Sequence, residues 1–89
     1  MAGSKYLRFE MEDKAPGKKT YNTKVYSAQY GNLLGVIRWY GPWRQYAFFP
    51  ESSTLYSAGC LQDIQNHIIF LMERRRHEKS LENKGRKEA

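Results

Sequence analysis

Cysteine is nearly absent from this sequence, and its scarcity limits how the fold can be held together. Cys60 is the single cysteine in the 89 residues, so no disulfide can form within the chain. No metal-ligand spacing accompanies it. We therefore expect a fold held by ordinary packing, with no metal and no other cofactor, in a reducing cytoplasmic compartment.

Long apolar runs are missing too. No stretch approaches the roughly 20 apolar residues that a membrane span requires. The first residues, Met-Ala-Gly-Ser-Lys, lack the apolar run of a secretory signal. The sequence thus predicts a soluble protein with no membrane contact.

Sets of catalytic residues are equally scarce. His67 and His77 have no carboxylate or nucleophile at a readable spacing, and no phosphate-binding glycine loop or paired-carboxylate motif appears. Cys60 stands at the start of a predicted helix, where a small buried residue is more common than a nucleophile. We expect a protein that is not an enzyme.

Acidic residues are fewer than basic ones. The chain has 15 Lys and Arg against 9 Asp and Glu, a formal charge of +6 and a pI near 9.6. Such an excess favours a polyanionic partner such as nucleic acid or a nucleotide phosphate. The alternative is that the charge serves solubility alone, because much of it lies near the C-terminus.

Aromatic residues, in contrast, are abundant, and they concentrate in residues 33–49. β-Branched and aromatic residues on both sides of Gly41-Pro42 predict a β-hairpin. With those two residues as the loop, Tyr40 would face Trp43 and Trp39 would face Arg44. Alternation then sorts the side chains into two faces. One face carries Leu34, Val36, Arg38, Tyr40, Trp43, Gln45, Ala47 and Phe49, and the other carries Leu33, Ile37, Trp39, Arg44, Tyr46 and Phe48.

Other segments predict a sheet and one helix. Residues 5–12 alternate as a half-buried strand, residues 20–28 form a second strand, and residues 54–56 a short one. Residues 58–76 read as a helix capped by Ser57. Its apolar stripe consists of Leu61, Ile64, Ile68, Leu71 and Met72.

The expected fold is therefore α+β: an antiparallel sheet of four to five strands with one C-terminal helix packed across one face. Residues 1–4 are expected to be disordered, residues 5–76 to form a single domain, and residues 77–89 to form a charged, largely disordered tail.

One helix can cover only one face of the hairpin, so the other apolar face implies a binding surface. Rings stack on nucleobases and arginines pair with phosphates. The alternative is that the rings form the core and the arginine stems cover its edge. The predicted binding residues are Arg38, Trp39, Tyr40, Trp43, Arg44, Tyr46, Lys24, Arg74 and Arg75.

The run Arg74-Arg75-Arg76 can equally be a solvated helix end. Off the helix stripe, Ile69 and Phe70 are either ordinary exposed residues or a self-association contact.

Two resemblances follow. The pattern Leu-Gly-x-Ile-x-Trp-Tyr followed by Trp-Arg-Gln-Tyr-x-Phe, within residues 33 to about 72, resembles a family of short uncharacterised proteins of phages and mobile elements. It implies a setting of host takeover or counter-defence. The element order, strands followed by a helix entered through Thr54-Leu55-Tyr56-Ser57, is similar to the Whirly-like single-stranded-DNA-binding coactivators. That likeness implies a dimer that binds single strands across its sheet faces.

The leading hypothesis is a non-catalytic homodimeric module that binds single-stranded nucleic acid through the basic-aromatic hairpin. One alternative is a phage or mobile-element factor that docks on a host protein. Another is a sponge for a nucleotide signal, which would need rings and arginines in a closed pocket.

Overall fold

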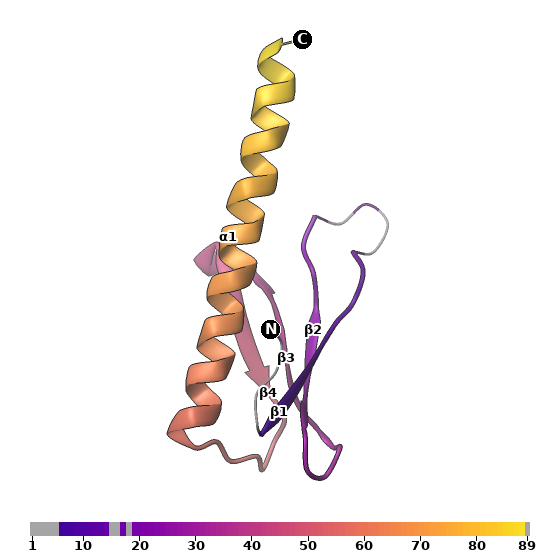
Figure 1. Ribbon diagram of the computed structural model, residues 1–89, viewed down its shortest axis with the longest axis vertical. Helices are drawn as coiled ribbons and strands as arrows, with labels where there is room; N and C mark the ends of the chain where they lie inside the picture. Colours follow the sequence, from indigo (N-terminus) through magenta and orange to yellow (C-terminus); the bar gives the residue numbers. More distant parts are fainter. Residues whose placement is uncertain (1–5, 15–16, 18, 89) are drawn as a thin grey trace.

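The protein consists of a four-stranded antiparallel sheet with one long helix across one face (Figure 1). This computed structural model describes residues 6–14, 17 and 19–88, with side chains through residue 80. The strands follow one another in the order β1-β2-β3-β4. The elements are β1 (Leu7–Met11), β2 (Thr23–Ser27), β3 (Leu33–Tyr40), the 3-10 turn η1 (Gly41–Trp43), β4 (Gln45–Pro50) and α1 (Ala58–Glu88). The predicted α+β fold is confirmed.

The hairpin β3–β4 exists, but its predicted register is wrong. Tyr40 pairs with Gln45 and Trp39 with Tyr46, because the loop contains the whole segment 41–44 rather than Gly41-Pro42 alone. Pro42 lies in the first turn of η1, which its fixed φ favours. The shift amounts to two residues along β4. An even shift preserves which side chains share a face, so the predicted sorting survives within the strands.

A single glycine allows the middle of the hairpin to pack. Gly35 is buried, and a Cβ atom on it would lie 2.6 Å from the backbone oxygen of Phe49 and 2.7 Å from the ring of Phe48. The Phe48 ring therefore occupies the space where any other residue would place its side chain. The same ring meets Tyr56 edge to face, with centroids 5.4 Å apart.

The segment that leads into the helix is not the predicted short strand. Residues 54–56 form no ladder; instead, Tyr56 donates a hydrogen bond of 2.8 Å to the backbone oxygen of Leu34. Ser57 caps the helix as predicted, because its hydroxyl accepts a hydrogen bond of 3.2 Å from the backbone N–H of Cys60.

α1 is longer than the sequence predicts and buries a narrower stripe. It runs to Glu88 instead of ending near residue 76. Ile64 and Leu71 are buried, whereas Leu61 is 51% exposed. Leu61 lies about 60° around the helix from Ile64, off the line that meets the sheet.

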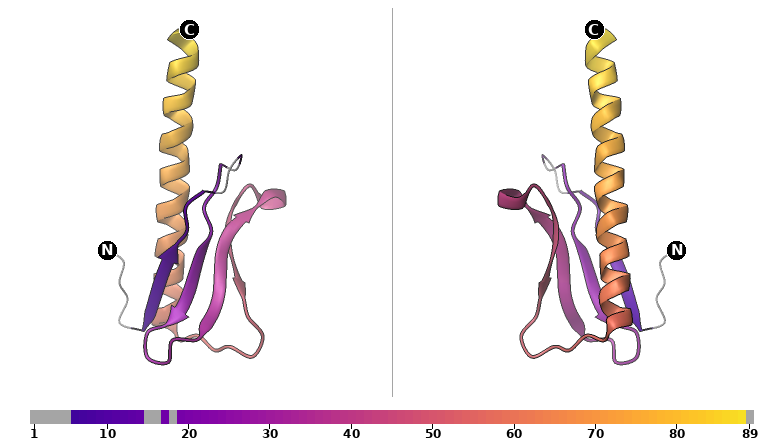
Figure 2. Two further views of the ribbon diagram at one scale, coloured as in Figure 1. Left: turned by 90° about the vertical axis from the view of Figure 1, so that its right-hand side faces the viewer. Right: turned by 90° about the vertical axis from the view of Figure 1, so that its left-hand side faces the viewer.

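The molecule measures 50 × 22 × 22 Å, and Figure 2 shows α1 extending past the end of the sheet. Residues 1–4, predicted to be disordered, and Ala89 lie outside the described residues. The predicted division into a domain of residues 5–76 and a disordered tail of residues 77–89 stays a prediction.

The core lies between α1 and the inner face of the sheet. It comprises Leu7, Val25, Ile37, Tyr46, Ile64 and Leu71. Thr23 is the buried polar residue of the described chain, and its hydroxyl lies 3.0 Å from Nε2 of His67. The His67 ring also stacks on Phe9, with centroids 4.9 Å apart and planes 4° from parallel. His67, which the sequence left without a partner, therefore joins the helix to β1 and β2.

Gly35→Ala should destabilise the protein by about 1–3 kcal/mol, because the added methyl group would overlap Phe48 and the backbone of Phe49. The free energy of unfolding in urea measures this cost. Gly59→Ala is the matched control: its Cβ would meet nothing closer than 3.8 Å, and alanine is the better helix former. Equal stability of the Gly35→Ala variant and the wild type would contradict the close packing.

Lowering the pH should destabilise the protein through His67. Burial lowers the pKa of His67 below 6.5, so the folded state favours the neutral ring. This stabilisation is complete above pH 6.5 and is lost as the pH falls below it, at no more than ~1.4 kcal/mol per pH unit. Unfolding free energies between pH 7.5 and 5 should fall less in His67→Gln. The control His77→Gln changes an exposed histidine of α1, and its slope should match the wild type. If the unfolding free energy of His67→Gln fell with pH as steeply as that of the wild type, His67 would not be the source of the pH dependence.

Candidate functional site

A cleft of about 490 Å³ lies between the tip of the β3–β4 hairpin and the middle of α1. Figure 2 shows η1 at the end of the hairpin, level with the middle of the helix. Two sequence segments that are distant along the chain therefore supply the two walls. The lining residues are Trp39, Gly41, Arg44, Met72, Arg75, Arg76 and Lys79.

The cleft is lined by cations and by no carboxylate. Arg75, Arg76 and Lys79 come from the helix, and Arg44 comes from the hairpin. Within the described part of the chain, none of the four has an ion-pair partner. Four other cations do: Arg8 with Glu10, Lys14 and Arg74 with Glu78, and Lys24 with Glu12. Arg38 and Lys19, which lie outside the cleft, also lack an ion-pair partner among the described residues, but four unpaired cations share this one concave surface. Such an arrangement attracts anions.

An aromatic stack supports the cleft from the sheet side. The Arg75 guanidinium lies 4.2 Å from the ring centroid of Trp39. Trp39 meets Tyr46 edge to face at 5.4 Å, and Tyr46 is only 3% exposed. The buried Tyr46 ring supports the half-buried Trp39 ring, and Trp39 supports the guanidinium of Arg75. This order fixes the position of Arg75 without a carboxylate partner.

Arg44 occupies an unusual backbone conformation at the end of η1. Its φ of 54° and ψ of 45° are left-handed, and its N–H donates a hydrogen bond of 3.0 Å to the oxygen of Gly41. Its exposed side chain has no hydrogen-bond or ion-pair partner among the described residues. The turn therefore fixes the backbone while leaving the guanidinium available.

The uncovered sheet face carries a second group of the predicted residues. Arg38 lies 3.8 Å from the ring centroid of Phe49, and Tyr40 meets Phe49 at 6.0 Å. Tyr40 also meets Trp43 edge to face at 4.9 Å, and Trp43 is 64% exposed at the hairpin tip. Lys24 lies on this face too, within 3.2 Å of Glu12.

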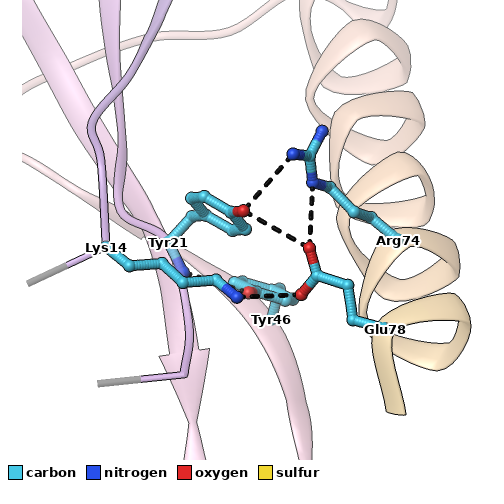
Figure 3. A network of polar contacts seen from close by, with 5 residues as sticks. All are labelled: Lys14, Tyr21, Tyr46, Arg74 and Glu78. Atoms are coloured by element: carbon cyan, nitrogen blue, oxygen red, sulfur yellow. Dashed lines mark hydrogen bonds and ion pairs between the residues drawn. The ribbon is translucent and has the colours of Figure 1, made fainter. Parts of the chain in front are cut away.

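Arg74 belongs to a polar network on the opposite flank of α1 (Figure 3). Its guanidinium donates to Glu78 at 3.4 Å and to the Tyr21 hydroxyl at 3.3 Å, while Lys14 contacts Glu78 at 2.9 Å. Tyr21 in turn donates its backbone N–H to the Tyr46 hydroxyl at 3.2 Å. The network links the segment between β1 and β2 to the helix, which indicates a structural role for Arg74.

The structure thus divides the predicted binding residues into separate groups. It brings Trp39, Arg44 and Arg75 together in the cleft and buries Tyr46 beneath them. Arg38, Tyr40, Trp43 and Lys24 lie on the open face or at the tip, and Arg74 lies on the far flank.

Lys79 was not foreseen, and Arg76 was foreseen only within a charge run. The spacing of 75, 76 and 79, which places all three on one flank of a helix, is the signal that could have found them.

Ile69 and Phe70 are each 45% exposed on α1, and the Phe70 ring lies 5.6 Å from that of His67. Self-association through them stays a prediction.

Among the residues that the structure describes, no helix has the length and apolar character that a membrane span requires. Over the same residues, no group of three His, Cys, Asp or Glu side chains could hold a metal ion.

Comparison with known proteins gives one informative likeness. The chain is 40% identical over 73 residues to the uncharacterized 9.3 kDa protein of Acholeplasma phage L2, an alignment that covers 82% of this chain and 92% of the phage protein. No protein-family model matches the chain. No solved structure matches it either, so the resemblance to Whirly-like coactivators gains no support.

Glu78→Gln should destabilise the protein by about 0.5 kcal/mol near pH 7, a value typical of partly exposed ion pairs. The hydrogen bond from Lys14, aided by Arg74, lowers the pKa of Glu78 below 4.5. The contribution is therefore complete above pH 4.5 and is lost as the pH falls through the lowered value. Urea unfolding at pH 7 and pH 3 should show the difference between variant and wild type shrinking. A difference that stays constant would contradict the ion pair.

Proposed function

The chain belongs to the same family as the uncharacterized 9.3 kDa protein of Acholeplasma phage L2, and from this premise we propose that it is a phage protein that binds single-stranded nucleic acid without catalysis. The predicted combination of aromatic rings and arginines is retained, but the residues that bind phosphate are different. The phosphate-binding part lies in the cleft rather than across the whole hairpin.

The concentration of unpaired cations in the cleft carries the proposal. Four like charges that face a shared concavity repel one another, and an anion placed between them removes that repulsion. Phosphate groups of a nucleic-acid strand supply such anions at regular intervals, and each neutralised phosphate releases counterions. Arginines, which form three of the four charges, bind phosphate oxygens in a bidentate manner.

The hairpin tip supports a single strand over a duplex. Trp43 belongs to the same turn as Arg44, and most of its side chain is exposed. Bases stack on such rings when they are free of a partner strand, at ~1–3 kcal/mol each. A phosphate held by Arg44 would place the neighbouring base within reach of Trp43.

A nucleotide-binding function is the second candidate. The volume of about 490 Å³ falls within the range of ordinary small-molecule pockets. A free nucleotide would use the same cations and would not need Trp43. Docking on a host protein would instead use the open sheet face with Arg38 and Phe49, and its affinity should depend little on salt.

Replacing Arg76 and Lys79 together by Gln should weaken the binding of a labelled oligothymidylate about tenfold, or ~1.4 kcal/mol. Anisotropy titrations over a range of salt concentrations measure the effect. The slope of log affinity against log salt should decrease by about 1.4, because two phosphate contacts are lost. Arg75 is left in place because it packs on Trp39.

The matched control replaces Arg8 and Lys24 by Gln, which removes the same charge from the open face, where both residues are ion-paired. Its affinity should stay near that of the wild type. Equal losses in the two double variants would attribute binding to net charge alone and contradict the cleft. Saturable binding of mononucleotides, with no gain for longer oligomers, would favour the second candidate.

A further inference from the structure

Two residues other than glycine adopt a left-handed backbone in the described chain, and they differ in what their side chains do. They are Arg44, with φ of 54°, and Ser53, with φ of 59°. This region is costly for residues that carry a Cβ atom, and Gly or Asn is usual there. Ser53 lies in the exposed turn after β4, whereas Arg44 lines the cleft.

The contact that closes the turn at position 44 does not depend on an arginine side chain. The hydrogen bond that closes η1 uses the backbone N–H, which glycine would also supply. Among the described residues, the exposed Arg44 side chain forms no hydrogen bond, ion pair or cation–π contact that would offset the cost of the backbone conformation. Strained residues of this kind cluster at ligand-binding and active sites, and of the two in the described chain only Arg44 lines a cleft.

Arg44 supplies a cation on the wall of the cleft that faces the helix. The other three cations all come from α1, so Arg44 is the cation of the sheet-side wall. An anion held by the helix alone would be contacted from one side only. With Arg44 present, a phosphate is contacted from both walls, and the planar guanidinium adds a bidentate hydrogen-bond pair.

We propose that Arg44 is the phosphate-recognising residue of the cleft and that the η1 turn gives up stability in order to hold it there. The inference rests on the proposed function and deepens it, because it assigns recognition of the strand's phosphate to one side chain. Two consequences follow. Removing the side chain and its strain together should stabilise the protein while weakening binding.

Arg44→Gly tests both consequences in the full-length protein. The midpoint of thermal unfolding should rise by about 2–5 °C, because glycine adopts the left-handed conformation without a steric cost. The affinity for a labelled oligothymidylate should fall about tenfold or more. Ser53→Gly is the matched control, since it relieves the same kind of strain away from the cleft. It should raise the midpoint by a similar amount and leave the affinity unchanged.

Arg44→Lys separates charge from geometry. Lysine keeps the charge and the backbone cost but cannot form the bidentate pair, so the midpoint should stay near the wild type and the affinity should fall less than in Arg44→Gly.

The outcomes separate this inference from the proposed function. A wild type that binds no oligonucleotide overturns the proposed function and this inference together. A wild type that binds, with Arg44→Gly binding equally well, overturns this inference alone. A lower midpoint in Arg44→Gly would also overturn it, because the arginine would then serve the fold.

Discussion

Tyr46 is the residue on which both the fold and the cleft depend. Its hydroxyl accepts the backbone N–H of Tyr21, which joins it to the strand that begins at Thr23. Its own N–H points at the sulfur of Met72 on the helix, at 3.4 Å. Its ring supports Trp39, and through Trp39 the guanidinium of Arg75. A single buried phenol thus transmits the packing of the core to the wall of the cleft, so the arginine is positioned by apolar contacts rather than by an opposite charge.

The distribution of ion pairs gives the molecule its electrical asymmetry. Arg8 and Lys24 on the open face and Arg74 on the far flank of α1 form ion pairs with carboxylates, which reduces their effect on a passing anion. Arg38 is the exception on the open face, because its guanidinium packs on the Phe49 ring. Those of the cleft lack such neighbours among the described residues. The net charge of +6 therefore understates the local potential at the cleft and overstates it elsewhere. Composition alone cannot reveal this, because it counts charges without saying which ones are neutralised.

The sequence predicted the elements better than the site. Alternation identified the strands, and the spacing of Ile64 and Leu71 identified the helix. The hairpin register was wrong by two residues because a 3-10 turn replaced the expected two-residue loop, yet the faces remained correct because the error was even. The helix end could not be predicted from residues 77–88, which carry few apolar side chains to mark a packed face. The site was harder still: Trp39, Arg44 and Arg75 meet only after the hairpin and the helix pack together, and nothing local in the sequence encodes that contact.

The two tryptophans of this chain occupy contrasting environments, one beneath an arginine in the cleft and the other exposed at the hairpin tip. An indole under a guanidinium and an indole in water emit at different wavelengths and are quenched to different degrees. The protein therefore contains its own pair of optical reporters. A ligand that enters the cleft would perturb one emission component, a base that stacks on the tip would perturb the other, and the order of the two changes would reveal which end of the site is occupied first.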